Sequence, residues 1–460
     1  MSPLLQLGRR RALDGSPPSS SFALPTSHLV THGVIVGMTG SGKTGLVTVL
    51  VEEALRAEVP VIVLDVKGDL PNLRLVPALE PEEVGPWIEP LAHETEREHA
   101  ARVQRSSDER REALAAWSIG EGELDDYRAR THVRLITPGS EAGELLHVLS
   151  ALERRSPRWD TDVEGARAAL AAASSLLLRL IGRDADPARS KDHVFLSLLA
   201  EQRLLAGRDA DLASLVPEIL EPPMRTVGAL EVDAFLSARS RKDLAASLNG
   251  LLASPTFASW RMGATLDVAS WVAPVDGKTP ATIVSVAHLD DDERELVLGM
   301  VLEEILTWVR GLSGTQSLRA LVVFDEVYGF LPPHPASPPT KRPIVALMKQ
   351  ARAFGVGVVL ATQNPMDLDY RALSNAGLWC LGRLQTDADR ERVIDGLAGA
   401  AGSKQSAEEL SRVLKRLSSR WFVVRDAHDG ESCMLMQPRW AMSLLRGPMT
   451  RGEIRRAVAS

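Results

Sequence analysis

Residues 37–44 read GMTGSGKT, and they directly follow the apolar run 33–36, GVIV. This order of strand, glycine-rich turn and helix start is the phosphate-loop pattern GxxxxGK(S/T) with all of its fixed positions filled. Its glycines let the backbone bend tightly, so that successive N–H groups point at one phosphate, and the positive end of the following helix adds to the field. A chance Gly/Ser loop is the alternative, and the preceding strand argues against it. The stretch therefore predicts a nucleoside triphosphate site.

The loop residues have distinct expected roles. Lys43 is expected to reach the β- and γ-phosphates, and Thr44 is expected to offer its hydroxyl to Mg²⁺. ATP and Mg²⁺ are therefore the expected cofactors. The loop residues predicted to bind ATP are Gly37, Met38, Thr39, Gly40, Ser41, Gly42, Lys43 and Thr44.

A second apolar run, residues 320–324 (ALVVF), ends in two adjacent carboxylates, Asp325 and Glu326. In phosphate-loop NTPases the first acid orients Mg²⁺ with its waters, and the second polarises the attacking water. We therefore predict that Asp325 is a metal ligand and that Glu326 is catalytic. An ordinary strand closed by a charged turn is the alternative, which the phosphate loop in the same chain disfavours.

A third apolar run, residues 358–362 (VVLAT), is followed by Gln363 and Asn364. A polar amide just past the carboxyl end of a neighbouring strand lies where it can sense the γ-phosphate. We predict this catalytic sensor role for Gln363, with Asn364 as the second candidate. Gln-Asn-Pro is also a natural chain reversal, and both interpretations stay open.

The composition is that of a globular protein. The chain has 460 residues, of which 45% are hydrophobic and 25% are charged, and it contains no uncharged apolar run of membrane-spanning length. The Ser/Pro-rich stretch behind the N-terminal arginines does not resemble a secretory signal. The two cysteines, Cys380 and Cys433, have no CxxC partner, which favours buried thiols in a reducing compartment and disfavours a zinc site. We expect a cytoplasmic location and no membrane partner.

The net charge is −7, from 53 basic and 60 acidic residues. Such a chain does not bind nucleic acid through bulk positive charge, although a DNA contact confined to a few loops is compatible with it. Aromatic residues make up 4% of the chain, which disfavours base stacking as the main binding mode.

The chain divides into four expected parts. A flexible N-terminal arm is expected over 1–27, because arginines are followed there by a Pro/Ser-rich stretch. The first part of an α/β core follows over 28–140, with a charged stretch at about 90–130 that predicts one long solvated helix. An Ala- and Leu-rich inserted helical subdomain is expected over 141–260. The second part of the core and C-terminal strands complete the chain over 261–460.

Several expected strands are apolar without alternation, which indicates a mostly parallel sheet covered on both faces. These strands are expected at about 32–37, 61–66, 133–137, 281–286, 320–324, 357–362, 378–383, 421–425 and 432–437.

The ordered set GMTGSGKT, LDVKGDL, VVFDEVYGFLPP, KQARAFGVGVVLATQNP and GRLQTDADRERV resembles the HerA/FtsK group of ATPases, and most closely the bacterial HerA-like ATP-binding proteins. The resemblance covers residues 28–75 and 240–450. It implies a RecA-like core in a six-membered ring, ATP hydrolysis at subunit interfaces and translocation of duplex DNA through a central pore.

The resemblance also implies roles for single residues. Asp65 matches an acid placed near the nucleotide. Arg352 falls where the family places an arginine that reaches into the next subunit's site, where it would stabilise charge on the transferred phosphoryl group. A helix-surface ion pair is the alternative for Arg352, and Arg383 and Arg390 are lesser candidates. The resemblance supports the roles already predicted for Lys43, Thr44, Asp325, Glu326 and Gln363.

Two features depart from the family pattern. HerA-type translocases usually carry a small β-barrel before the phosphate loop, and the roughly 30 residues there are too few for one. The segment 90–240 contains no motif that the family explains. Two cation clusters are candidates for holding DNA phosphates, with a plain solvated surface as the alternative. They are Lys341 with Arg342, and Arg239 with Arg241 and Lys242.

The residues and the resemblance together predict an ATPase of RecA-like α/β fold, and the resemblance implies that it forms a homo-hexameric ring on double-stranded DNA. A nuclease or another effector protein is an expected partner. Two alternatives stay open. One is a motor of the same core that acts on protein or serves a secretion system, and the other is a slow nucleotide-gated scaffold that recruits an effector.

Overall fold

The computed structural model describes residues 2–13, 20–76, 79–363, 368–369, 373, 375–399, 407–430 and 433–459. Contacts divide the chain into two units. The sheet unit comprises Met1–Leu135, Ala269–His288 and Val309–Ser460, and the helical unit comprises Ile136–Val268 and Leu289–Trp308. Asn364 lies outside the described residues.

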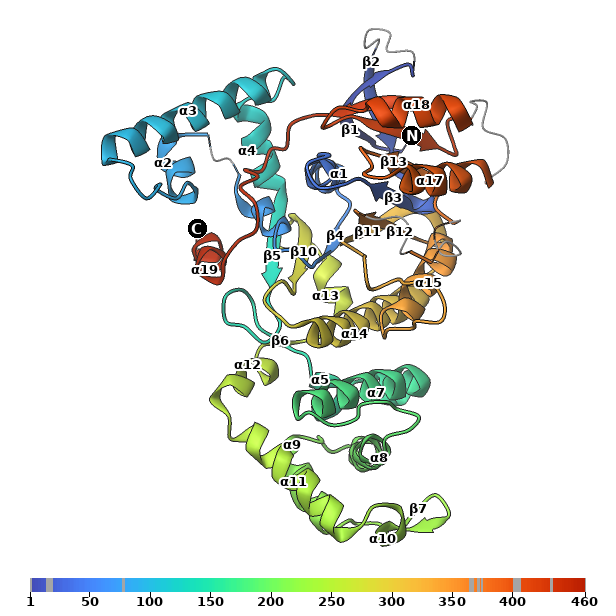
Figure 1. Ribbon diagram of the computed structural model, residues 1–460. Helices are drawn as coiled ribbons and strands as arrows, with labels where there is room; N and C mark the ends of the chain where they lie inside the picture. Colours follow the sequence, from blue (N-terminus) through green and yellow to red (C-terminus); the bar gives the residue numbers. More distant parts are fainter. Residues whose placement is uncertain are drawn as a thin grey trace. The chain divides into compact units, whose positions relative to one another are not determined.

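One large sheet organises the sheet unit (Figure 1), and in the described chain its strand order is β2-β1-β15-β14-β13-β3-β12-β11-β4-β10-β5. The run from β13 to β10 is parallel throughout, whereas β1, β2, β14 and β15 pair antiparallel at one side. The mostly parallel sheet is therefore confirmed. The strands are β1 (Leu4–Arg11), β2 (Ser20–Pro25), β3 (Gly33–Val36), β4 (Val61–Asp65), β5 (Thr131–Ile136), β10 (Thr279–Ser285), β11 (Thr315–Asp325), β12 (Phe354–Thr362), β13 (Leu378–Leu381), β14 (Phe422–Asp426) and β15 (Met434–Pro438).

The central strands are buried on both faces, as their unbroken apolar sequences predict. Every residue of β3, β4 and β10 is buried. The helix that follows the phosphate loop, α1, packs against β1, β3, β4, β10, β11 and β15. The helices of the sheet unit are α1 (Lys43–Arg56), α2 (Pro81–Val84), α3 (Glu96–Ala115), α4 (Glu121–Arg130), α13 (Val268–Val272, whose first residue belongs to the helical unit), α15 (Lys341–Gln350), α17 (Asp387–Gly399), α18 (Ala407–Arg416) and α19 (Arg451–Ala459), with 3-10 turns η1 (Thr26–Thr31), η2 (Leu70–Arg74), η3 (Gly85–Trp87) and η5 (Ala351–Ala353).

The N-terminal segment is not the flexible arm that its composition suggested. Residues 4–11 form β1, which pairs with β15 near the other end of the chain and with β2. Leu5, Leu7 and Leu24 are at most 1% exposed. Gly8 lies so close to the carbonyl oxygen of Gln437 that a Cβ would collide with it. The expectation was wrong because β15, one of the two strands that pair with β1, lies more than 400 residues away in the sequence.

The charged stretch at 90–130 forms two helices, α3 and α4, where one was predicted. Thr95 and Glu98 form a capping box at the start of α3. After α3 the backbone reverses at Ser118, whose φ is 58°, and α4 begins after Gly120. In α3 the buried positions are Val103, Ser107 and Leu114, so most of its surface is solvated, as predicted.

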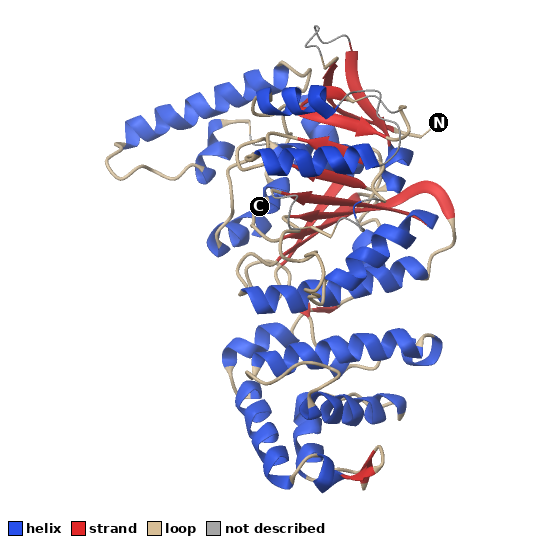
Figure 2. Ribbon diagram, turned by 45° about the vertical axis from the view of Figure 1, so that its right-hand side comes forward, coloured by secondary structure: helices blue, strands red, loops and turns tan. Residues whose placement is uncertain are grey.

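The helical unit overlaps the segment 141–260, for which the sequence predicts an inserted helical subdomain. Helix α7 packs on α5, α6 and α8, and α9 packs on α8 and α11 (Figures 1 and 2). The unit is wider than the predicted 141–260, since it also takes most of α14. Its elements are α5 (Ser150–Glu153), α6 (Arg158–Thr161), α7 (Val163–Leu180), α8 (Lys191–Leu205), α9 (Leu212–Leu220), α10 (Val232–Phe235), α11 (Ala238–Leu252), η4 (Pro255–Phe257), α12 (Ala258–Arg261), α14 (Asp291–Arg310) and the short strands β6 (Leu146–His147), β7 (Thr226–Val227), β8 (Leu230–Glu231) and β9 (Ala264–Thr265).

Candidate nucleotide site

The predicted phosphate loop connects β3 to α1 and is anchored to both strands beside β3. The N–H of Gly37 donates to the carbonyl of Thr362 at 3.1 Å, and that of Met38 donates to the carbonyl of Arg383 at 2.8 Å. Gly40 and Gly42 have φ angles of 78° and 92°, a left-handed conformation that favours glycine. The loop thus has the bent backbone that phosphate binding requires.

Lys43 joins the loop to the two acids at the end of β11. Its side chain is 5% exposed, its Nζ donates to Glu326 Oε1, and Nζ lies 3.6 Å from Asp325 Oδ1. The loop and the acids are more than 280 residues apart in sequence, yet β12 alone separates β3 from β11 in the sheet. The fold therefore brings Lys43, Asp325 and Glu326 into one site.

Asp325 has the surroundings of a ligand for a hard cation. Among the described residues, neither of its buried carboxylate oxygens accepts a hydrogen bond. Burial raises the pKa of Asp325, with Lys43 opposing that shift. A Mg²⁺ ion would satisfy these oxygens, because Mg²⁺ prefers oxygen ligands and takes one or two carboxylates together with substrate phosphates and water. Thr44, in the first turn of α1, would supply a further oxygen.

Within the described residues, no group of three or more His, Cys, Asp or Glu side chains could hold a metal ion.

Glu326 is held in a strained conformation by several donors. Its φ is 58°, in the left-handed region that a glutamate rarely adopts. Besides Lys43, Gln363 Nε2 donates to Glu326 Oε1 at 2.6 Å, and Thr39 Oγ1 donates to Gln363 Oε1 at 2.7 Å. Burial alone would raise the pKa of Glu326, but its cationic and amide partners together lower it. Gln363 therefore bridges the phosphate loop and the predicted catalytic acid.

Sequence reasoning assigned no role to Lys67, which the structure places at the same carboxylate. Its Nζ lies 2.6 Å from Glu326 Oε1. Lys67 stands two residues after β4, and β4 pairs with β11 so that Asp65 and Asp325 are register partners. The signal that could have identified Lys67 is its position just past the carboxyl end of β4, which lies beside β11.

Asp65 itself is fully buried and is engaged by the protein. Its Oδ1 accepts from the N–H of Gly68 at 3.0 Å, and its Oδ2 accepts from Ser285 Oγ at 2.8 Å. Burial raises the pKa of Asp65 to about 7. In this arrangement Asp65 shapes the turn that carries Lys67, and its direct contact with a nucleotide stays a prediction.

Arg352 is the one predicted catalytic residue that the fold keeps away from this cluster. It lies exposed in η5, immediately before β12, whereas Gln363 follows the end of β12. Its charge acts on His32, and together with burial, the larger cause, it lowers the pKa of that histidine to about 4. Within one chain, Arg352 thus stands at the amino edge of the parallel strands and the phosphate loop at their carboxyl edge.

A C-terminal segment also contacts the phosphate loop. Ser419 Oγ donates to the carbonyl of Gly40 at 2.7 Å, and the N–H of Arg420 donates to the carbonyl of Ser41 at 2.8 Å. The Arg420 guanidinium lies 3.8 Å from the centroid of the Trp440 ring. A Cβ on Gly42 would come within 2.9 Å of Arg420 Cγ. This close approach is a second reason, in addition to the φ angle, why position 42 is a glycine. Sequence reasoning did not identify this support.

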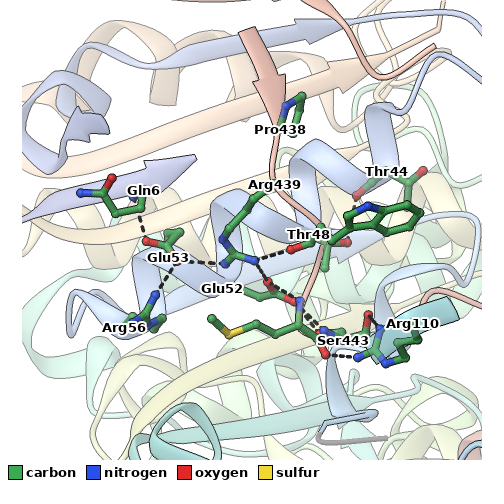
Figure 3. Close-up of polar contacts among 12 residues, drawn as sticks. Gln6, Thr44, Thr48, Glu52, Glu53, Arg56, Arg110, Pro438, Arg439 and Ser443 are labelled. Carbon is green, nitrogen blue, oxygen red and sulfur yellow. Dashed lines mark hydrogen bonds and ion pairs between the residues drawn. The ribbon is translucent and has the colours of Figure 1, made fainter. Parts of the chain in front are cut away.

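A buried ion-pair network ties the residues after β15 to α1 (Figure 3). Arg439 donates to Glu52 Oε2 and to Glu53 Oε1, each at 2.9 Å. Glu52 also accepts from the N–H groups of Met442 and Ser443, and Glu53 accepts from the N–H of Gln6. Because Glu52 and Glu53 lie two turns behind the phosphate loop, the network fixes the helix on which that loop depends.

The cations considered for DNA contact have partners within the chain. Lys341 pairs with Asp369 at 3.2 Å, and its side chain is 12% exposed. In the helical unit, Arg241 pairs with Asp233 at 2.6 Å, and its side chain is 8% exposed. Neither is a freely exposed phosphate contact. Arg390 pairs with Asp387.

The fold and this site define a P-loop NTPase with a RecA-like core. Residues 20–115 match the family model described as the central domain of helicase HerA. The predicted resemblance to the HerA/FtsK group is therefore confirmed. None of the curated proteins matches the chain.

The first of three similar solved structures has a TM-score above 0.5 and shares the overall fold. VirB4 of Thermoanaerobacter pseudethanolicus is 14% identical over 95% of this chain and 96% of its own, with a TM-score of 0.52. The bacterial conjugative coupling protein TrwB is 10% identical over 98% of this chain and 99% of its own, with a TM-score of 0.49. The genome packaging NTPase B204 from Sulfolobus turreted icosahedral virus 2, bound to AMPPCP, is 16% identical over 37% of this chain and 72% of its own, with a TM-score of 0.25.

Proposed function

We propose that this protein is an ATP-hydrolysing ring motor of HerA/FtsK type that moves along or unwinds double-stranded DNA. The observation that carries the proposal is the convergence of Lys43, Asp325, Glu326 and Gln363 at the carboxyl edge of the parallel sheet. These are the side chains that phosphoryl transfer to water needs, namely a phosphate-binding cation, a metal ligand, a water-aligning acid and a sensor.

In the proposed mechanism the loop N–H groups and Lys43 hold the β- and γ-phosphates. Asp325 and the Thr44 hydroxyl hold Mg²⁺, which when bound neutralises charge on the phosphates. Glu326 accepts a hydrogen bond from the attacking water and aligns it with the γ-phosphorus. Gln363, which contacts both Thr39 and Glu326, would report the loss of the γ-phosphate to the loops at that edge.

The position of Arg352 supports assembly into a ring. With the whole of β12 between Arg352 and the end of the sheet that carries the phosphate loop, Arg352 is too distant to contact a triphosphate bound in its own chain. In a head-to-tail ring, the amino edge of one copy can approach the carboxyl edge of the next. A hexamer in which each Arg352 completes a neighbour's site is the proposed assembly.

DNA is the proposed substrate because of the match to the HerA central domain, and the contact would be made by few loops. Exposed cations near such loops are Arg342, at the start of α15, and Arg239 and Lys242, in the first turns of α11. The net charge of −7, together with the ion pairs of Lys341 and Arg241, favours a second candidate, a motor of the same core that acts on protein. A nuclease or another effector is a further proposed partner.

A cytoplasmic location is part of the proposal. It is supported by the burial of both cysteines, Cys380 and Cys433, as is typical of thiols in a reducing compartment. No helix in the described ranges combines the length and apolar character that a bilayer crossing requires.

The deciding experiment is ATP hydrolysis with and without duplex DNA over a series of salt concentrations, with Lys43→Ala as the inactive control. A DNA motor is expected to hydrolyse ATP faster on duplex, with stimulation that declines as salt rises because phosphate contacts release counterions. ATP hydrolysis that duplex DNA leaves unchanged at every salt concentration would favour the protein-directed motor. Absence of hydrolysis above the Lys43→Ala level would favour the slow scaffold.

A further inference from the structure

One carboxylate oxygen, Glu326 Oε1, is shared by three donors. Lys43 donates to it, Lys67 Nζ lies 2.6 Å from it, and Gln363 Nε2 lies 2.6 Å from it. Two of these donors carry a full positive charge. All three bind Oε1. Within the described ranges Oε2 takes part in none of these contacts, so it can accept a hydrogen bond from a water.

The three donors differ in whether they can keep their contact with Glu326 Oε1 once a triphosphate binds. Lys43 is the loop lysine, so the β- and γ-phosphates compete with Glu326 for it. Lys67 belongs to a different segment and, at 42% side-chain exposure, remains in contact with solvent, whereas Lys43 is 5% exposed. Lys67 and Gln363 are therefore the donors that can stay on Glu326 when Lys43 turns to the phosphates.

The turn that carries Lys67 is fixed from several sides. Asp65 accepts the N–H of Gly68, and the carbonyl of Gly68 accepts the N–H of Met449 at 3.0 Å. Gly68 has a φ of 87°, and a Cβ there would lie 3.3 Å from the Cβ of Ala287. A lysine on such a defined turn is placed for a specific contact, whereas a mobile surface lysine is not.

We propose that Lys67 is a positioning residue of the hydrolytic site. It acts with Gln363 to hold the Glu326 carboxylate in the orientation that aligns the attacking water, while Lys43 occupies the same oxygen until a triphosphate draws it away. Asp65 then acts through Lys67, by shaping its turn. This inference rests on the proposed ATP hydrolysis and names a residue that the phosphate-loop pattern does not contain.

The test replaces Lys67 by Met, which keeps the length of the stem and removes the charge. Lys67→Met is expected to lower kcat by about 10–100-fold, since a misaligned water-directing acid loses much of its effect. The Kd for a fluorescent ATP analogue is expected to stay within about threefold, with or without Mg²⁺, because Lys67 is not a phosphate ligand. Lys67→Arg is expected to recover part of the lost kcat.

A double variant separates positioning from any other role. If Lys67 acts through Glu326, Glu326→Gln and the double variant Glu326→Gln/Lys67→Met have the same residual rate, because the second change has nothing left to misalign. The matched control is Lys415→Met, since Lys415 is 52% exposed and pairs with Asp387 at 3.0 Å outside the site. Its kcat is expected to equal that of the unaltered protein.

Four results would overturn the inference. An ATP affinity at least tenfold weaker in Lys67→Met, with ADP affinity and kcat preserved, would make Lys67 a γ-phosphate ligand. Rate losses that multiply in the double variant would make it independent of Glu326. If the wild type hydrolyses ATP, Lys43→Ala does not, and Lys67→Met is fully active, this inference alone is refuted. If the wild type is no faster than Lys43→Ala, the proposed hydrolysis is refuted and the inference with it.

Discussion

Arg352 and Gln363 stand at opposite ends of the same strand, β12. The strand has 9 residues, so it separates them by about 30 Å at about 3.3 Å per residue. Gln363 contacts Thr39 of the phosphate loop, and Arg352 therefore cannot reach that loop in its own chain. Gln363, the proposed sensor of the site in its own chain, thus lies at one end of β12. Arg352, which we propose completes the site of a neighbouring copy, lies at the other end.

Glu326→Gln is expected to separate binding from hydrolysis. The amide keeps the shape of the side chain but aligns water poorly, so kcat is expected to fall by about 10²–10⁴-fold. The affinity for ATP is expected to stay the same or increase, because Lys43 loses a competing carboxylate. Nucleotide binding by fluorescence and hydrolysis by phosphate release measure the two effects. Glu391→Gln, an exposed acid on α17, is the control and should change neither.

Arg439 is expected to be essential for stability. Its replacement by Met leaves Glu52 and Glu53 buried without their main counter-charge, which is expected to lower the free energy of unfolding by about 3–5 kcal/mol in urea. Arg56 also bonds Glu53, at 3.0 Å, but is 33% exposed, so Arg56→Met is expected to cost at most about 1 kcal/mol. The triple variant Glu52→Gln/Glu53→Gln/Arg439→Met should regain much of the loss. Equal losses for the two arginine variants would contradict this account.

His32 is expected to make stability depend on pH. Burial, and secondly the charge of Arg352, lower its pKa from 6.5 to about 4, and its Nδ1 accepts the N–H of Val358 at 3.2 Å. Because the unfolded chain binds this proton more readily, the contribution is fully present above pH 6.5 and is lost as pH falls towards 4, a change of about 3 kcal/mol.

His32→Asn tests that expectation, since asparagine does not titrate and its amide oxygen can still accept a hydrogen bond from the N–H of Val358. The free energy of unfolding of this variant should vary less between pH 6.5 and 4, by about the same 3 kcal/mol. His93→Asn, at an exposed position, should leave the original pH dependence unchanged. An unaltered slope in His32→Asn would show that other groups cause it.

Sequence reasoning succeeded where the signal is local. The strands of the parallel core were predicted because burial on both faces makes each of them a continuous apolar run, as in β4 and β12. The phosphate loop and the pair Asp325–Glu326 lie at the ends of β3 and β11, as their residue types and spacing predicted, and their roles in binding and catalysis stay predictions. The RecA-like class follows from the order of these elements.

The missed features depend on contacts between distant segments. The pairing of β1 with β15 joins Gly8 to Pro438, and an arginine-rich strand with a glycine gives little local indication of it. Lys67 is recognised as part of the site only when β4 is known to lie beside β11. The support of Ser41 by Arg420 likewise exists only in the folded chain.

The most direct test of the central claim mixes two inactive variants. Lys43→Ala lacks the lysine of the phosphate loop but keeps Arg352, whereas Arg352→Ala keeps the phosphate loop but lacks the arginine. In a mixed assembly, the intact phosphate loop of an Arg352→Ala copy can therefore receive Arg352 from a neighbouring Lys43→Ala copy. We predict little ATP hydrolysis from either variant alone, recovery of a substantial fraction of wild-type activity on mixing, and no loss in the same-edge control Lys349→Ala. Full activity of Arg352→Ala alone, or a mixture as inactive as its components, would contradict the claim that each site is completed by a neighbouring copy.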